Sequence, residues 1–99
     1  MWTTIDDGER AATLARGLVE ERLAACVHVL PAGQSVYRWQ ERIETAQEHT
    51  LLIKTTTAGY AALEAWLLKR HPYQTPEIAA LPITQGLPDY LNWIRECTQ

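Results

Sequence analysis

The chain has 99 residues, enough for one small domain with a single hydrophobic core. Its formal net charge of −3 argues against a nucleic-acid partner, because nucleic-acid-binding proteins usually carry a basic excess on one face. No apolar run approaches the ~20 residues of a membrane span, and the basic and apolar regions of a signal peptide are not seen at the start. Cys26 and Cys97 lie far apart in the sequence. We therefore expect one domain over residues 1–99, with no membrane partner, in the reducing cytoplasm.

The first third of the chain predicts a strand, a helix and a second strand. Residues 1–5 are apolar and β-branched, which favours a strand. Asp6 is expected to cap a helix, with Glu9 completing a capping-box-like start. Apolar residues at helical spacing continue this helix, with Leu23 closing its last turn. The apolar run at 25–30 then predicts the second strand.

The second strand is predicted to bend and to continue as a long arm. Residues 31–33, Pro-Ala-Gly, would interrupt the pairing as a bend or bulge does, and strand character resumes over residues 35–43. Tyr37, Trp39 and Ile43 are expected to share one face of this arm. An arm that reaches beyond a small domain exposes large side chains and unpaired edge groups, so a neighbouring subunit is the simplest cover for it.

The second half of the chain predicts a turn at 45–48, a strand at 49–56, a helix from Thr57 to His71, a strand at 78–83 and a last helix from Pro88. Lys54 lies within the 49–56 strand, where a lysine is typical of a sheet edge, a snorkelling side chain or a ligand site. The whole order is strand, helix, strand, strand, helix, strand and helix. This is the split β-α-β pattern of an α+β, ferredoxin-like sandwich with an extra C-terminal helix.

The loop between the second helix and the 78–83 strand is the first candidate for a binding site. It contains His71, Tyr73 and Glu77, and the two prolines Pro72 and Pro76 each fix their own φ. Such prolines reduce the entropy that is lost when the loop is held in one shape. A rigid polar loop that presents Glu77 on an apolar strand indicates a ligand site, and a loop that only connects a helix to a strand is the alternative.

Five segments of the sequence together resemble the CutA divalent-cation tolerance family. The loop from residue 71 reads His-Pro-Tyr-Gln-Thr-Pro-Glu, and the strand after it ends in Leu-Pro-Ile. Earlier segments read Glu-Arg-Leu-Ala-Ala-Cys-Val at 21–27, Ser-Val-Tyr-Arg-Trp at 35–39 and Leu-Ile-Lys-Thr at 52–55. The residues Tyr-Leu-Asn-Trp-Ile at 90–94 resemble the last helix of the family. The resemblance covers nearly the whole chain, in the same order and with the same gaps.

The resemblance implies a ferredoxin-like fold that assembles as a homotrimer through its long strands. We therefore expect Tyr37 and Trp39 at the subunit interface. The resemblance also implies a role in divalent-cation tolerance, with copper as the candidate cation, through binding rather than catalysis.

The copper ligands of the family are a Cys in the first strand and a His pair before the Pro-Tyr of the loop. In this sequence the corresponding positions are occupied by Thr3, Arg70 and His71. Arg cannot ligate a metal and Thr is a poor ligand for a soft cation, so only His71 remains of this set. A divalent-cation site in this chain is expected to use His71 and Glu77.

The first strand is shorter than is usual in the family. Because this strand lies inside the sheet in the ferredoxin-like fold, shortening it would leave backbone groups without partners. Either the natural start lies upstream or another group fills the gap. We expect that several additional apolar residues at the N-terminus would raise the melting temperature.

Two other functions remain open. The trimeric ferredoxin-like arrangement resembles the PII signalling proteins, which bind small molecules in clefts between subunits. Such a cleft would be lined by Cys26, Trp39, Lys54, Tyr73 and Glu77, with Lys54 pairing with an anion and Glu77 orienting it. The remaining alternative is a trimeric scaffold without a ligand. An enzyme is not expected, because the sequence has no Gly-x-Ser-x-Gly, P-loop or dinucleotide-binding motif.

Overall fold

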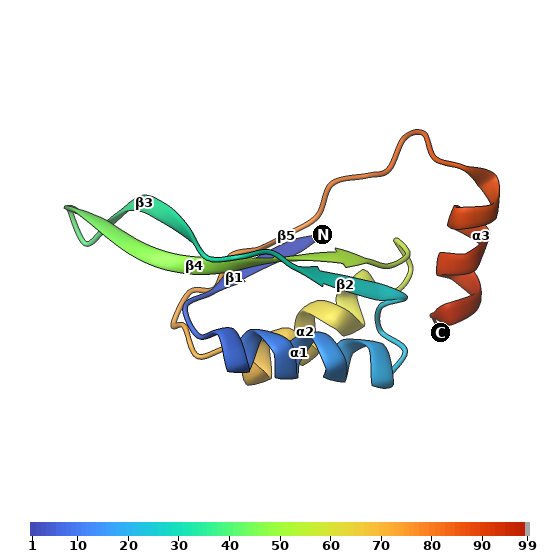
Figure 1. Cartoon of the computed structure of the whole chain (residues 1–99), viewed down its shortest axis with the longest axis horizontal. Helices are drawn as coiled ribbons and strands as arrows, with labels where there is room; N and C mark the ends of the chain where they lie inside the picture. The colour runs from blue at the N-terminus through green and yellow to red at the C-terminus, as the bar shows by residue number, and fades with distance from the viewer. Residues whose placement is uncertain (99) are drawn as a thin grey trace.

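In the computed structural model, which describes residues 1–98, one antiparallel sheet is covered on one face by two helices, and a third helix lies beyond the end of the sheet (Figure 1). The strands are β1 (Trp2–Ile5), β2 (Cys26–Val29), β3 (Gly33–Trp39), β4 (Arg42–Lys54) and β5 (Ile78–Ala79). The helices are α1 (Gly8–Glu20), α2 (Tyr60–Arg70) and α3 (Pro88–Cys97). None of the helices in residues 1–98 combines the length and the apolar character that crossing a membrane requires.

The strand order agrees with the predicted split β-α-β pattern. The order is β2-β4-β1-β5, and β3 pairs with the first half of β4, residues 42–48. Trp2 of β1 lies opposite Leu52 of β4 on one side and Ala79 of β5 on the other, so the first strand lies inside the sheet as expected. The α+β class and the extra C-terminal helix are confirmed.

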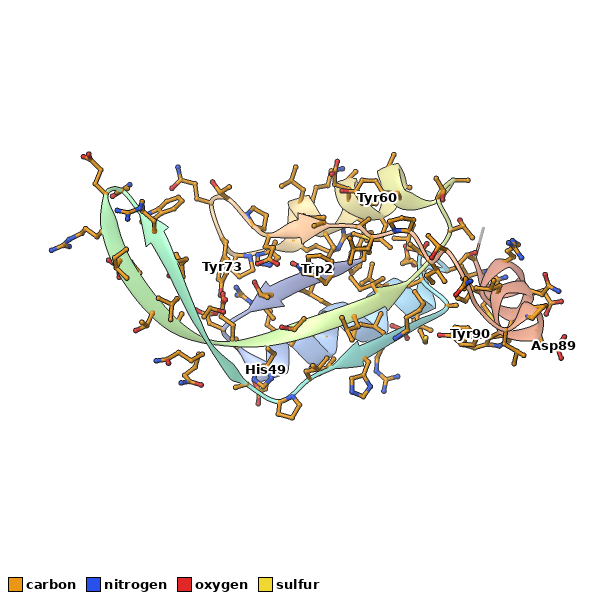
Figure 2. The ribbon with its side chains drawn as sticks, turned by 90° about the horizontal axis from the view of Figure 1, so that it is seen from above. Trp2, His49, Tyr60, Tyr73, Asp89 and Tyr90 are labelled. Carbon is orange, nitrogen blue, oxygen red and sulfur yellow. The ribbon has the colours of Figure 1, made fainter. Side chains whose placement is uncertain are left out.

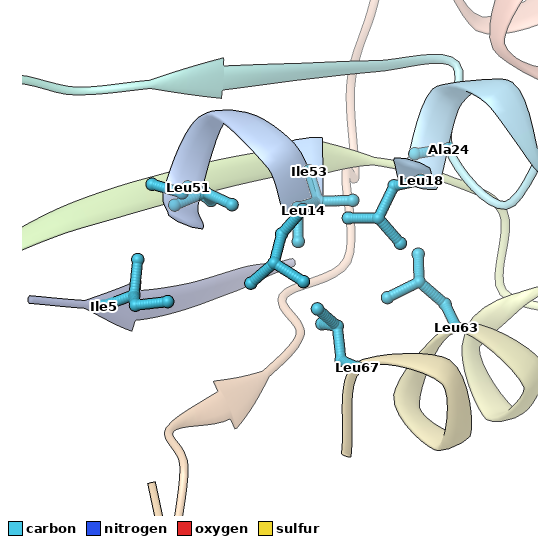
Figure 3. Packing of buried hydrophobic residues seen from close by; sticks show 9 residues of the cluster. Ile5, Leu14, Leu18, Ala24, Leu51, Ile53, Leu63 and Leu67 are labelled. Atoms are coloured by element: carbon cyan, nitrogen blue, oxygen red, sulfur yellow. The ribbon is translucent and has the colours of Figure 1, made fainter. Parts of the chain in front are cut away.

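The core lies between the sheet and the two helices α1 and α2 (Figure 3). Leu51 and Ile53 of β4 are buried while Leu52 between them is 41% exposed, which is the alternation that a strand with one covered face requires. Leu14 and Leu18 of α1 meet this face one helical turn apart. Burial of these aliphatic side chains is the main source of stability, since each contributes roughly 1.5–3 kcal/mol when fully buried.

The predicted arm proves to be a β-hairpin, so the prediction of one strand over residues 35–43 and a turn at 45–48 was wrong. The chain reverses at Gln40 and Glu41, whose φ angles of 50° and 66° are those of a two-residue turn with both central residues in the left-handed region. The residues of the predicted turn continue β4, with Thr45 opposite Val36. The reversal also moves Ile43, which pairs with Arg38 and therefore lies on the face opposite to Tyr37 and Trp39.

The start and the end of α1 differ from the prediction. Asp7 rather than Asp6 is the N-cap, and its Oδ1 accepts hydrogen bonds from the backbone N–H groups of Glu9 at 2.9 Å and Arg10 at 3.2 Å. The helix ends at Glu20, and Arg22 adopts a left-handed φ of 59°. Leu23 therefore lies beyond the helix rather than in its last turn.

Two further boundaries were wrong. Helix α2 begins at Tyr60 after Gly59 as N-cap, because Thr57 belongs to the preceding turn, where its carbonyl accepts from the N–H of Tyr60 at 3.3 Å. Strand β5 contains only Ile78 and Ala79, and residues 80–87 run as an extended connection to α3 (Figure 1). Leu81 and Ile83 are exposed on this connection, so these apolar residues form part of the surface and do not mark a buried strand.

Candidate functional site

His71 fixes the start of the loop between α2 and β5. It caps α2, and its ring Nε2 lies 2.9 Å from the carbonyl oxygen of Thr4 in β1. The backbone N–H of Tyr73 donates to Nδ1 at 3.2 Å, so Nδ1 is the acceptor and Nε2 carries the proton of a neutral ring. Burial lowers the pKa of His71. Nε2 therefore holds the loop against β1, and Nδ1 fixes the conformation of the loop itself.

Tyr73 joins the same loop to the longest strand. Its hydroxyl donates to Oε2 of Glu48 in β4 at 2.6 Å, and Figure 2 shows the side chain extending from the loop toward this strand. Burial, the hydrogen bond to Glu48 and the negative charges of Glu48 and Asp6 all raise the pKa of Tyr73. The phenol therefore remains a protonated donor at neutral pH in a region of negative potential.

Glu77 lies at the other end of the loop, beside β1. The indole Nε1 of Trp2 donates to Oε2 of Glu77. Together with the hydrogen bonds from His71 to Thr4 and from Tyr73 to Glu48, this contact holds the loop to β1 and β4 at separate points.

The loop, the hairpin β3–β4 and β1 enclose a cavity of about 580 Å³, which we call the hairpin cavity. It is lined by Thr4, Asp6, Ser35, Val36, Tyr37, Trp39, Ala46, Glu48, Tyr73, Gln74, Thr75 and Glu77. Three of these residues are carboxylates, namely Asp6, Glu48 and Glu77, and none of the described lining residues is a Lys, Arg or His. The polar atoms that its side chains can offer to a ligand are therefore mostly oxygens.

The structure brings together some of the predicted site residues and separates others. Trp39, Tyr73 and Glu77 all line the hairpin cavity. Cys26, the first residue of β2, lies opposite Lys54, the last residue of β4. There the Sγ atom of Cys26 is 3.8 Å from the hydroxyl of Tyr90 in α3. Within one chain, the five residues of the predicted cleft therefore form two groups.

His71 and Glu77, the two predicted metal ligands, do not line the same cavity. Glu77 is part of the lining of the hairpin cavity, whereas His71 is buried and is not part of that lining. Over residues 1–98, no three His, Cys, Asp or Glu side chains are grouped closely enough to hold a metal ion. Thr3 is fully buried and its Oγ1 has no hydrogen-bond partner in the part of the chain described. Arg70 stacks on Trp66, with its Cζ atom 4.2 Å from the ring centroid.

Sequence reasoning did not find two of the three cavity carboxylates. Asp6 was assigned to a helix cap and Glu48 to a turn, and both instead line the cavity. Glu48 could have been placed in a strand only by locating the chain reversal at Gln40 and Glu41, since residues 42–54 then form one strand.

The ferredoxin-like sheet with its protruding hairpin and trailing helix defines a class of small α+β proteins. The model of the CutA1 divalent ion tolerance protein family matches residues 1–97, and the chain belongs to this family.

Two curated relatives illustrate the range of sequence similarity. The divalent-cation tolerance protein CutA of Thermus thermophilus is 50% identical over 95 residues, which cover 96% of this chain and 92% of that protein. The human protein CutA is 39% identical over 98 residues, which cover 99% of this chain and 55% of that protein. The similarity therefore extends over nearly the whole chain.

Solved structures of relatives have the same fold. The divalent cation tolerance protein of Thermus thermophilus superposes with a TM-score of 0.96 at 48% identity, covering 99% of this chain and 95% of that chain. CutA from Xylella fastidiosa superposes with a TM-score of 0.95 at 46% identity, covering 99% and 94%. A relative from Arabidopsis thaliana is called chloroplastic and one from Archaeoglobus fulgidus periplasmic, so the cytoplasmic location of this chain stays a prediction.

Proposed function

We propose that this chain acts in divalent-cation tolerance by binding a divalent cation in the hairpin cavity, without catalysis. The observation that carries the proposal is the charge of the lining, which contains Asp6, Glu48 and Glu77 and no basic described residue. A concave site lined by one sign of charge concentrates ions of the opposite sign. The negative charges that raise the pKa of Tyr73 are a second sign of the same field. An organic anion would be repelled from this cavity.

The donor atoms favour a hard cation over copper. Carboxylate and hydroxyl oxygens suit Mn²⁺, Mg²⁺ or Ca²⁺, whereas copper favours nitrogen and sulfur donors. His71 could offer a nitrogen only by giving up a hydrogen bond to Thr4 or to Tyr73. Over residues 1–98 no three His, Cys, Asp or Glu side chains are grouped closely enough to hold a metal ion by themselves. We therefore propose that Glu77 and Glu48 are the principal ligands, that groups of a neighbouring subunit complete the coordination, and that His71 positions the loop carrying Glu77.

We further propose that the protein assembles as a homotrimer through the hairpin. Val36 and Ile43 on one face of the hairpin are 64% and 62% exposed, and Tyr37 and Trp39 on the other face are 44% and 39% exposed. Large exposed apolar surfaces of this kind are typical of protein interfaces. Since Tyr37 and Trp39 also line the hairpin cavity, a subunit packed on the hairpin would help to close the cation site.

A calorimetric titration with MnCl₂, and in parallel with CuCl₂, tests the cation site. Glu48→Gln and Glu77→Gln keep the size of each side chain and remove one charge, and each is expected to weaken Mn²⁺ binding at least about tenfold. Glu20→Gln removes an exposed carboxylate at the end of α1, outside the cavity, and is expected to leave binding unchanged. Equal affinities in all four proteins would refute the proposed site. Copper binding that His71→Ala abolishes and Glu77→Gln preserves would place the metal at His71 instead.

A further inference from the structure

A second cavity of about 700 Å³ lies at the opposite end of the sheet, and we call it the helix cavity. It is formed by the end of β4, the turn at 55–58, the extended connection at 80–83 and α3. Its volume falls in the range of small-molecule sites, about 300–1,000 Å³. In Figure 1, α3 lies beyond the end of the sheet, at the end of a long connection.

The helix cavity has the opposite charge to the hairpin cavity. Its described lining contains Lys54 and Arg95 but no Asp or Glu. Lys54 Nζ donates to the carbonyl oxygen of Leu52 at 3.3 Å, and Arg95 Nη1 donates to Oδ1 of Asn92 at 3.0 Å. Both acceptors are uncharged, and an ammonium has three donors and a guanidinium five, so each group retains donors for an anion.

The rest of the lining is largely apolar. The connection contributes Leu81, Pro82 and Ile83, and α3 contributes Leu91 and Ile94. Leu81 and Ile83 are 68% and 54% exposed, so a ligand seated against them would remove apolar surface from water. Two cationic groups beside an apolar wall match a ligand that has an anionic head and an apolar body.

We propose that the helix cavity binds a small organic carboxylate with an apolar tail. The carboxylate pairs with Lys54 and Arg95, and the tail lies between the 80–83 connection and α3. The sequence predicted that Lys54 pairs with an anion in a cleft between subunits, whereas the helix cavity is formed within one chain and has Arg95 as the second cationic residue of its lining. The inference goes beyond the cation site and does not depend on it, since no residue lines both cavities.

The ligand would also connect α3 to the body of the protein. The described polar contacts of α3 with the body are a hydrogen bond of 2.7 Å from Arg22 Nη2 to the carbonyl oxygen of Glu96, and the contact between Tyr90 and Cys26. Because Lys54 belongs to β4 and Arg95 to α3, a bound carboxylate would bridge these two elements. Binding should therefore raise the melting temperature as well as release heat.

Calorimetry with sodium octanoate as the probe tests the site, with octan-1-ol and inorganic phosphate as controls. Octanoate is expected to saturate at one molecule per protomer. Octan-1-ol lacks the charge and phosphate lacks the tail, so each is expected to bind at least about tenfold more weakly. Lys54→Gln and Arg95→Gln are each expected to weaken octanoate binding about tenfold. Lys69→Gln, on the exposed side of α2, is the matched control and should leave it unchanged.

Absence of saturable octanoate binding would overturn the inference, and so would equal binding of octan-1-ol. Equal affinity in the wild type, Lys54→Gln and Arg95→Gln would overturn it as well. Glu77→Gln separates the two sites, because it is expected to weaken Mn²⁺ binding and to leave octanoate binding intact. Failure at one cavity can therefore be told apart from failure at the other.

Discussion

The hydroxyl of Tyr73 donates a 2.6 Å hydrogen bond to Oε2 of Glu48, which joins the loop after α2 to the middle of β4. The two residues are 25 positions apart, and both line the hairpin cavity. The bond orients one carboxylate of the proposed cation site. It also makes the loop part of the rigid wall of the cavity.

Tyr73→Phe removes this bond and leaves the aromatic ring in place. Because the site is partly buried and the acceptor is charged, we expect a loss of about 1–2 kcal/mol in the free energy of unfolding. Tyr60→Phe is the control, since its hydroxyl makes a comparable 2.8 Å bond to Glu64 on the exposed surface of α2. Denaturant unfolding should show a clearly smaller loss for Tyr60→Phe. Equal losses in the free energy of unfolding would mean that the bond between Tyr73 and Glu48 stabilises the protein no more than an exposed bond does.

His71 makes the stability depend on pH. Burial places its folded-state pKa below the ordinary 6.5, so the unfolded chain binds the proton more readily. The contribution of the neutral ring is complete above pH 6.5 and is lost as the pH falls through the folded-state pKa. We expect the melting temperature of the wild type to fall between pH 8 and pH 5 by more than that of His71→Ala. His28→Ala, which changes an exposed histidine in β2, should keep the slope of the wild type.

At pH 8 the same His71→Ala variant should also be less stable. It leaves the carbonyl of Thr4 and the N–H of Tyr73 without their partner, which costs about 1–3 kcal/mol. A variant as stable as the wild type at pH 8 would contradict the positioning role of His71.

Gly17 allows α1 and α2 to approach closely. A Cβ atom at this position would lie 2.8 Å from Cη2 and 2.9 Å from Cζ2 of Trp66, whose ring is held under Arg70. Gly17→Ala should therefore destabilise the protein by about 1–3 kcal/mol through overpacking, although alanine is the better helix former by about 1 kcal/mol. Gly33→Ala meets nothing within 4 Å and is the control. Thermal unfolding gives the melting temperature of both variants. A Gly17→Ala protein whose melting temperature equals or exceeds that of the wild type would contradict the contact.

The hairpin interface predicts the state of assembly. Trp39→Asp places a charge on the proposed subunit contact, so sedimentation velocity should show the trimer shifting to monomer at micromolar concentration. Leu68→Asp changes a side chain that is 59% exposed on α2, away from the hairpin, and should remain trimeric. A wild type that sediments as a monomer would refute the trimer, whatever the variants do.

The core and the order of elements could be predicted because both depend on local periodicity. Leu51 and Ile53 alternate with Leu52, and Leu14 and Leu18 are one helical turn apart. The hairpin was missed because neither Gln40 nor Glu41 is one of the residues that ordinarily mark a turn with positive φ. Without that reversal, the polar residues 45–48 appeared to be the only place for a turn.

The site could be predicted only in part, because it depends on which distant segments meet. Tyr73 and Glu77 share one short loop, and Trp39 of the hairpin lines the same cavity. Within one chain Lys54 lies apart from them, because six residues along β4 separate it from Glu48 and a strand rises about 3.3 Å per residue, which gives roughly 20 Å. The predicted cleft between subunits stays a prediction. Local sequence patterns do not show which distant segments lie beside Glu48 in the fold.

The most direct test of the cation site is a titration of the isotope-labelled protein with Mn²⁺, followed by NMR. Bound Mn²⁺ is paramagnetic and broadens the amide signals of the residues nearest to it. We predict that the signals of Glu48, Tyr73 and Glu77 broaden first, at Mn²⁺ concentrations well below that of the protein. Early broadening centred on other carboxylates, such as Glu20 and Glu21, or no localised broadening at all, would contradict a cation site in the hairpin cavity.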